Sequence, residues 1–180
     1  MSASSMHEIW PVEPASLRRV CGLFVTGVTV ITTGAAGRLE GTTVNSFTSV
    51  SLEPPLVLFC LHKESRLLPR LRESRCFVVN FLASWQEPVA RAFARRDTAS
   101  FDDVGYTPSV VGAPVLSDAL AFLACRTTEE FEGGDHIIVL GEVVELGVPR
   151  GPREPLVFFA GSFGSLQDER RTAFHPISDG

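Results

Sequence analysis

The stretch GTTVNSFTSVSLEPPLVLFC, which runs from Gly41 to Cys60, decides the fold of this chain. Its first half is rich in Thr and Ser, whereas residues 56–60 are apolar without interruption. Pro54 and Pro55 separate the two halves. Because proline fixes φ and lacks a backbone donor, this pair predicts a turn or crossing between two extended segments. We expect the apolar segment to be a strand that is buried on both faces.

The hydroxyl-rich half presents polar side chains on both faces of any strand, from Thr42 to Ser51. Burying such groups without hydrogen-bond partners costs roughly a few kcal/mol each. They are therefore expected to lie on the surface, to form local hydrogen bonds or to face a polar ligand. An ordinary surface strand fits the pattern as well as a binding site does.

The length and composition are those of one soluble domain. The chain has 180 residues, of which 44% are hydrophobic and 21% charged. A net charge of -5 argues against a large nucleic-acid interface. The N-terminus lacks the apolar core of a signal peptide, and no apolar run approaches the roughly 20 residues of a membrane helix. We expect a cytoplasmic protein with no membrane partner.

Several motifs that would define other enzyme classes are absent from the sequence. It contains no dinucleotide fingerprint of the G-x-G-x-x-G type, no Walker A loop and no G-x-S-x-G elbow. The four cysteines are widely spaced and form no C-x-x-C pair, and the four histidines have no metal-ligand spacing. We expect reduced thiols and no metal site.

Hydrophobic periodicity predicts a mostly β chain with peripheral helices. Helices are expected over residues 15–24, 65–73 and 85–96, with Ser84 as a cap of the third and Pro69 and Pro88 in first turns. Strands are expected over residues 28–33, 39–51, 56–61, 76–82, 119–131, 136–146 and 155–163. Residues 97–114 are predicted to form a long loop, 1–14 an arm and 167–180 a tail. Because strands and helices do not alternate regularly, a closed antiparallel barrel is favoured over a parallel sheet.

The motif TGVTVITT from Thr26 to Thr33, followed by Gly41 to Cys60, resembles the short-chain flavin reductase family. Further matches occur in the family's order at residues 77–80, 93–94, 133–136 and 155–156, so the resemblance covers roughly residues 15–166. It implies an antiparallel split β-barrel of the FMN-binding type that binds FMN or FAD and oxidises NADH or NADPH. It also implies a homodimer and, as in many members, a partner monooxygenase that receives the reduced flavin.

The resemblance carries flavin-binding positions onto this chain. Backbone contacts are implied for Leu39, Glu40, Gly41, Thr42 and Thr43, and side-chain contacts for Asn45 and Ser46. A second group comprises Cys60, Leu61, His62, Ser65, Arg66 and Leu67, and Arg95 adds a positive charge. Within this set Ser65 is predicted to cap a helix whose free N–H groups attract phosphate, and Gly41 lets the chain approach the ligand closely. Asn80 is a weaker candidate.

A second set of positions is implied for the nicotinamide. Gly134, Asp135 and His136 belong to the turn Gly133–His136, where His136 would orient the carboxamide or stabilise reduced flavin. Phe158, Phe159, Ala160 and Gly161 match a region that the family uses near NADH. The alternative interpretation of residues 133–136 is a plain hairpin turn, and that of Phe158 and Phe159 is a core strand. Family members often have Tyr at the position of Phe163, and some have Arg at that of Ala160.

Hydride transfer between cofactors requires stacking and positioning rather than an acid/base pair, so the absence of such a pair does not oppose a flavin reductase. Two other functions fit the same residues. One is a split-barrel oxidase or oxygenase that acts on its own substrate, and the other is a non-catalytic flavin-binding redox protein. An oligonucleotide-binding barrel is disfavoured because basic and aromatic residues are not interleaved.

Overall fold

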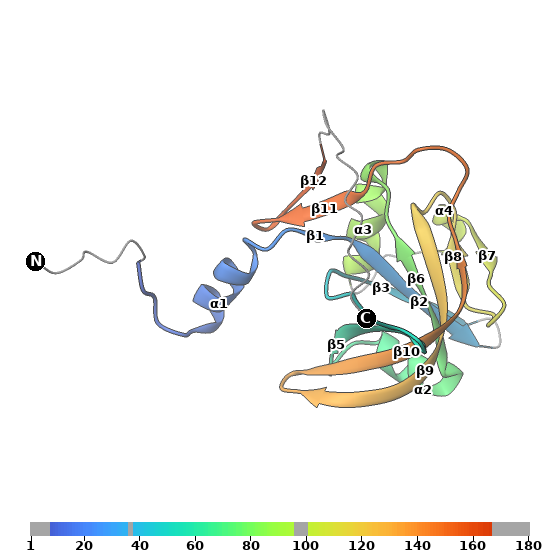
Figure 1. Ribbon diagram of the computed structural model, residues 1–180, viewed down its shortest axis with the longest axis horizontal. Helices are drawn as coiled ribbons and strands as arrows, with labels where there is room; N and C mark the ends of the chain where they lie inside the picture. The colour runs from blue at the N-terminus through green and yellow to red at the C-terminus, as the bar shows by residue number, and fades with distance from the viewer. Residues whose placement is uncertain (1–7, 36–37, 96–100, 167–180) are drawn as a thin grey trace, which may run out of the picture.

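The computed structural model describes residues 8–35, 38–95 and 101–166. Most of these residues form antiparallel strands, and the helices lie at the periphery (Figure 1). This confirms the predicted class, mostly β with peripheral helices. Half of the predicted N-terminal arm, residues 1–7, and the whole predicted C-terminal tail, residues 167–180, lie outside the described residues.

One antiparallel sheet of seven strands dominates the molecule. In spatial order its strands are β3 (Arg38–Val44), β2 (Thr29–Ala35), β6 (Cys76–Phe81), β9 (Ala121–Gly133), β10 (His136–Gly147), β5 (Pro55–His62) and β4 (Thr48–Leu52). Two smaller sheets join β1 (Thr26–Gly27), β11 (Leu156–Phe159) and β12 (Ser162–Ser165), and β7 (Tyr106–Pro108) with β8 (Pro114–Leu116). The helices are α1 (Pro14–Cys21), α2 (Leu67–Ser74), the 3-10 helix η1 (Ser84–Gln86), α3 (Glu87–Ala94) and α4 (Phe101–Val104).

The connection between β3 and β4 shows that the large sheet curls into a barrel. These strands are the two edges of the sheet, yet only residues 45–47 separate them along the chain. Four Cα steps span at most roughly 14 Å, whereas a flat sheet of seven strands would hold its edges roughly 29 Å apart. The edges therefore approach one another, which leaves a split between β3 and the β5–β4 pair.

Strand β5 alternates instead of being buried on both faces, so that prediction was wrong. Val57, Phe59 and Leu61 point into the barrel with exposures of 4% or less, and Leu58 and Cys60 are half-buried. The inward residues pack with Phe77 of β6 and with the apolar face of α2, which closes one end of the barrel. The outward face of β5 is thereby available for contacts outside the core.

The predicted strand 39–51 is two strands. β3 ends at Val44, the chain turns through residues 45–47, and β4 begins at Thr48. The expected hairpin of β2 with β3 is confirmed, as is the turn at the double proline, because β4 and β5 pair on either side of it. The break falls where the chain crosses between the sheet edges, a tertiary requirement that strand propensity does not register.

The predicted strand 155–163 is a hairpin of β11 and β12. Its turn contains Ala160 and Gly161 at φ of 49° and 82°, a backbone conformation in which Ala is uncommon. The predicted loop 97–114 is also partly wrong. It includes α4 and β7, and its end enters β8; residues 97–100 lie outside the described part of the chain.

The helix predicted over 85–96 begins as η1 and continues as α3, with Arg96 outside the described residues. Ser84 does not cap it. Gln86 Oε1 accepts a hydrogen bond of 3.0 Å from the N–H of Ala83, the residue before η1, and no side-chain hydrogen bond caps α3. Pro69 and Pro88 lie in first turns as predicted. The hairpin predicted around Gly133–His136 is formed by β9 and β10.

All four cysteines are free, as predicted. Burial raises the pKa of the Cys125 thiol to about 12, so that this side chain behaves as a small apolar residue at neutral pH. Among the described residues, no helix is long and apolar enough to cross a membrane, and no cluster of three His, Cys, Asp or Glu could hold a metal ion.

Candidate functional site

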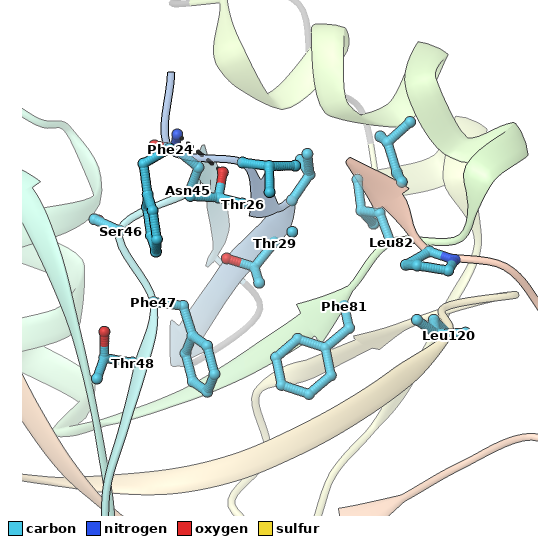
Figure 2. A pocket seen from close by; sticks show the side chains of 15 residues that line it. Phe24, Thr26, Thr29, Asn45, Ser46, Phe47, Thr48, Phe81, Leu82 and Leu120 are labelled. Atoms are coloured by element: carbon cyan, nitrogen blue, oxygen red, sulfur yellow. Dashed lines mark hydrogen bonds between the residues drawn. The ribbon is translucent and has the colours of Figure 1, made fainter. Parts of the chain in front are cut away.

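Two cavities lie along the split of the barrel. The larger has a volume of about 500 Å³, and its lining includes Phe24, Thr26, Asn45, Ser46, Phe47, Phe81 and Leu82. Figure 2 shows Phe24, Asn45 and Ser46 together on one side, with Phe47 and Phe81 facing each other across from them. The rings of Phe47 and Phe81 are 5.1 Å apart in an edge-to-face arrangement. An apolar cavity with a few polar groups at one side suits a flat aromatic ligand.

The smaller cavity, of about 190 Å³, lies between β3, the turn after β5, and the end of α3. Eight residues of the predicted flavin set line it: Glu40, Gly41, Thr42, His62, Ser65, Arg66, Leu67 and Arg95. They come from three separate segments of the chain. This cavity is too small for a ring system of three fused rings, but its two arginines suit an anionic group.

Asn45 and Ser46 lie at the larger cavity in different hydrogen-bonding states. The Ser46 hydroxyl donates to the carbonyl of Cys60 at 3.1 Å and accepts from the N–H of Cys60 at 3.0 Å, so it clamps the β3–β4 connection to β5. Asn45 donates only one long, exposed bond of 3.3 Å, to the hydroxyl of Thr26. The amide of Asn45 therefore has capacity left for a ligand, whereas Ser46 mainly positions the connection.

Gly41 and Thr43 both lie against α3. A Cβ on Gly41 would lie 2.7 Å from the ring of Phe93, so the absence of a side chain accommodates that ring. The Thr43 hydroxyl donates to the carbonyl of Ala90 at 2.8 Å. Packing of α3 on the edge strand is therefore a second reason for a glycine here, beside the predicted approach of the backbone to a ligand, since Gly41 also lines the smaller cavity.

The N-terminus of α2 offers less to an anion than the sequence predicts. Ser65 lies one residue before the N-cap position, Arg66, and its hydroxyl accepts a bond of 3.3 Å from the N–H of Leu67. The N–H of Leu68 donates to the carbonyl of Ser65 at 3.2 Å, and Pro69 has no N–H. Attraction of an anion to this cavity therefore depends mainly on the arginine side chains.

Four predicted flavin positions line neither cavity: Leu39, Thr43, Cys60 and Leu61. Leu61 is 2% exposed and belongs to the barrel core. Leu39 packs beside Gly34, where an added Cβ would lie 2.6 Å from its Cδ2. Asn80, the weaker candidate, is fully buried and fully bonded, so it is part of the scaffold.

The turn Gly133–His136 brings its histidine beside the smaller cavity. His136 pairs with His62 across β10 and β5, and their rings are 5.3 Å apart. The carboxylate of Asp135 lies 2.7 Å from His136 Nδ1, and this hydrogen bond together with the imidazole charge lowers the pKa of Asp135. A carboxylate can only accept, so Nδ1 carries a proton and Nε2 is left for other partners. Gly134 itself lines neither cavity.

The other predicted nicotinamide residues lie elsewhere in the chain. Phe158 pairs with Thr26 across β11 and β1, and its ring packs against Phe163 at 5.3 Å. Phe159 is 48% exposed. Figure 1 shows the β11–β12 hairpin at the top of the molecule, far from the tip of β9–β10. One chain therefore does not bring the two predicted nicotinamide groups together.

Sequence reasoning missed most of the wall of the larger cavity and a smaller part of the wall of the other. At the smaller cavity it missed Glu64, Phe93 and Ala94, and at the larger one the segment 24–29, Phe47 and Phe81. The segment 24–29 directly precedes and overlaps the motif Thr26–Thr33, which could have indicated it. Phe47 and Phe93 lie in matched stretches too, within Gly41–Cys60 and at residues 93–94. Phe81 gave no such signal, because an apolar residue that lines a cavity has the same sequence pattern as one that fills a core.

The molecule is a curled antiparallel sheet with an apolar cavity and a small charged cavity at its split, an arrangement that suits a flat ligand with an anionic tail. The chain belongs to the family described as flavin reductase like domain, which matches residues 21–167. It is 43% identical over 172 residues to an NADH-dependent FAD reductase from Streptomyces globisporus, with 91% of this chain and 93% of that protein covered.

Two further relatives extend the comparison. The chain is 40% identical over 149 residues to the FMN reductase (NADH) SmoA from Agrobacterium fabrum, with 83% and 84% of the two chains covered. The structure superposes with a TM-score of 0.87 on a homologue of nitrilotriacetate monooxygenase component B from Mycobacterium thermoresistibile, at 37% identity and with 92% and 93% covered. The expected split-barrel fold is thereby confirmed.

Proposed function

We propose that this chain is an NAD(P)H-dependent flavin reductase that transfers hydride from a nicotinamide to FMN or FAD. The observation that carries the proposal is the placement of the two cavities three residues apart on one stretch of chain, Thr42 at the smaller and Asn45 at the larger. A flavin has the matching shape, an aromatic ring system joined by a short chain to phosphate. The names of the relatives support the same reaction.

The residues of the chain fit the two ends of a flavin. In the larger cavity, Phe47 and Phe81 provide apolar contact for the ring, and the Asn45 amide can donate and accept along its polar edge. Arg66 and Arg95 line the smaller cavity, where they would hold the phosphate. Bound flavin supplies the hydride acceptor, so the protein's part is to position the ring and leave one face open to the nicotinamide.

His62 and His136 border the site as further polar groups. The N–H of Glu64 donates to His62 Nδ1 at 3.1 Å, so the His62 proton is on Nε2 and can be donated to an anion. The bond to Asp135 fixes the ring of His136 in one orientation. We propose that His136 contacts the nicotinamide or the flavin through Nε2.

The reaction is tested by mixing the purified chain with NADH or NADPH and an excess of FMN or FAD, and following the nicotinamide absorbance. We expect oxidation of at least one nicotinamide with at least one flavin. No oxidation in any of the four combinations would refute the proposal. Flavin binding without oxidation would indicate the non-catalytic alternative, and a tightly held flavin with poor turnover of added flavin would indicate the oxidase.

We further propose that the chain acts as a homodimer in the cytoplasm and passes reduced flavin to a partner monooxygenase. Helix α1 has no buried residue, and Leu17, Leu23 and Phe24 are 56%, 63% and 76% exposed. Figure 1 shows α1 away from the barrel. An eight-residue helix is unstable without packing, so a second copy is the expected cover. Light scattering that gives a monomer mass at micromolar protein would contradict the dimer.

A further inference from the structure

The smaller cavity contains two opposite charges that do not pair with each other. Glu40 of β3 is half-buried, Arg95 follows α3, and both line the cavity of about 190 Å³. Within the described ranges, no hydrogen bond or ion pair holds the Glu40 carboxylate, and none joins it to Arg95. A half-buried carboxylate without a partner is unusual, because ionised groups lose hydration on burial. The arrangement suits a ligand that brings both an anion and hydrogen-bond donors.

Glu40 lies at the end of the site that is far from the ring. It is five positions before Asn45 in the sequence, which corresponds to roughly 16 Å along an extended chain. If the flavin ring lies at Asn45, the ribityl chain and its phosphate extend roughly 8 Å from it, given bond lengths near 1.5 Å. Glu40 therefore lies at the far side of the cavity proposed for the phosphate, next to the group that ends FMN and on the side where the second half of FAD would lie.

The two flavins present opposite chemistry to Glu40. FMN ends in a phosphate monoester with a charge of about -1.5 to -2, and this charge would repel a nearby carboxylate. FAD continues through a second phosphate to a ribose, whose two hydroxyls can donate to a carboxylate. An acidic side chain that binds ribose hydroxyls is a recurrent arrangement in dinucleotide sites.

We propose that Glu40 selects FAD over FMN. Its carboxylate accepts hydrogen bonds from the hydroxyls of the adenosine ribose, while Arg95 faces the diphosphate. This inference rests on the proposed flavin reductase function, and it assigns to that site a preference that the relatives leave open, since one is named an FAD reductase and another an FMN reductase.

The test compares the dissociation constants of FAD and FMN, measured by fluorescence titration of the purified full-length chain. We expect the wild-type chain to bind FAD at least about tenfold more tightly than FMN. In Glu40→Gln the side chain keeps its shape and loses its charge, and we expect the ratio to fall by about tenfold, because a charge-assisted hydrogen bond is lost. Glu129→Gln is the matched control, since Glu129 is exposed on β9 and lines neither cavity; its ratio should equal that of the wild type.

Two outcomes would overturn the inference. One is a wild-type chain that binds FMN as tightly as FAD, which requires no variant. The other is a Glu40→Gln chain in which both flavins weaken equally, because this would place Glu40 at a ribityl hydroxyl that the two share. If neither flavin binds and neither supports NADH oxidation, the reductase function itself fails. Circular dichroism of both variants verifies that the fold is retained.

Discussion

Asn80 and Asn45 carry the same amide in two regions of the barrel, and their surroundings differ in every respect. Asn80 is fully buried on β6; its Nδ2 donates to the Val30 carbonyl at 3.1 Å and to the Thr32 hydroxyl at 3.0 Å, and its Oδ1 accepts from the N–H of Leu116 at 2.8 Å. Asn45 makes one exposed bond of 3.3 Å, to the Thr26 hydroxyl. The comparison teaches that the residue type alone does not identify a ligand contact. An amide whose hydrogen bonds are all made within the protein supports the fold, whereas one with unused donors and acceptors can bind a ligand.

The largest effect is expected when the saturated amide is removed. Asn80→Leu leaves the N–H of Leu116 and the carbonyl of Val30 buried without their partner. We expect the free energy of unfolding to fall by about 3 kcal/mol or more, because each unsatisfied buried group costs about 1–3 kcal/mol. Urea unfolding measures this change. A loss below about 0.5 kcal/mol would show that the Asn80 network does not hold β8 to the barrel.

Gly41→Ala tests whether a residue at the split serves packing or ligand binding. The new methyl group would lie 2.7 Å from the ring of Phe93, so α3 must shift. We expect a destabilisation of about 1–3 kcal/mol, as for other overpacked sites. Gly164→Ala on β12 is the control, because its nearest neighbour would be 3.6 Å away. Unchanged stability with weakened flavin binding would instead return Gly41 to the ligand site.

Asn45→Leu is expected to weaken flavin binding by about tenfold, the loss of one good hydrogen bond. The free energy of unfolding should change by no more than about 0.5 kcal/mol, because the bond to Thr26 is long and exposed. Flavin titration and urea unfolding of the same preparation give both values. Unchanged affinity would show that Asn45 is not part of the flavin site.

The smallest effect concerns Asp135, which is exposed. Since the bond from His136 lowers its pKa, its carboxylate stabilises the folded chain above the ordinary pKa of Asp, near 4, and this contribution disappears as the pH falls through the lowered value. An NMR titration of the Asp135 carboxyl should show its pKa rising toward the ordinary value in His136→Ala. An unaltered titration would mean that the pair is not formed in solution.

The sequence predicted those elements that local chemistry determines. The double proline indicated the turn between β4 and β5, and Gly133 and Gly134 indicated the β9–β10 hairpin, because these residues restrict or permit backbone angles directly. The turn at Ala160 was not predictable in this way. Alanine has no preference for positive φ, and a single glycine inside an apolar run does not distinguish a hairpin from a strand.

The candidate site was predictable where it follows the chain and unpredictable where tertiary closure builds it. The predicted residues 40–42 and 65–67 line the same small cavity, because both segments flank the split. The crossing at residues 45–47 was read as strand, since Ser and Phe are compatible with one. Only the approach of the two sheet edges, a property of all seven strands, explains why the chain must turn there.

The three-residue crossing also has a thermodynamic consequence. A ligand seated along the split contacts both margins of the sheet, so its binding free energy is added to that of barrel closure. Such a ligand holds the two edges of the split together. In the ligand-free chain we expect amide hydrogens of β3 and β4 to exchange with solvent before those of β9 and β10, and occupancy of the split to slow that exchange at both margins together.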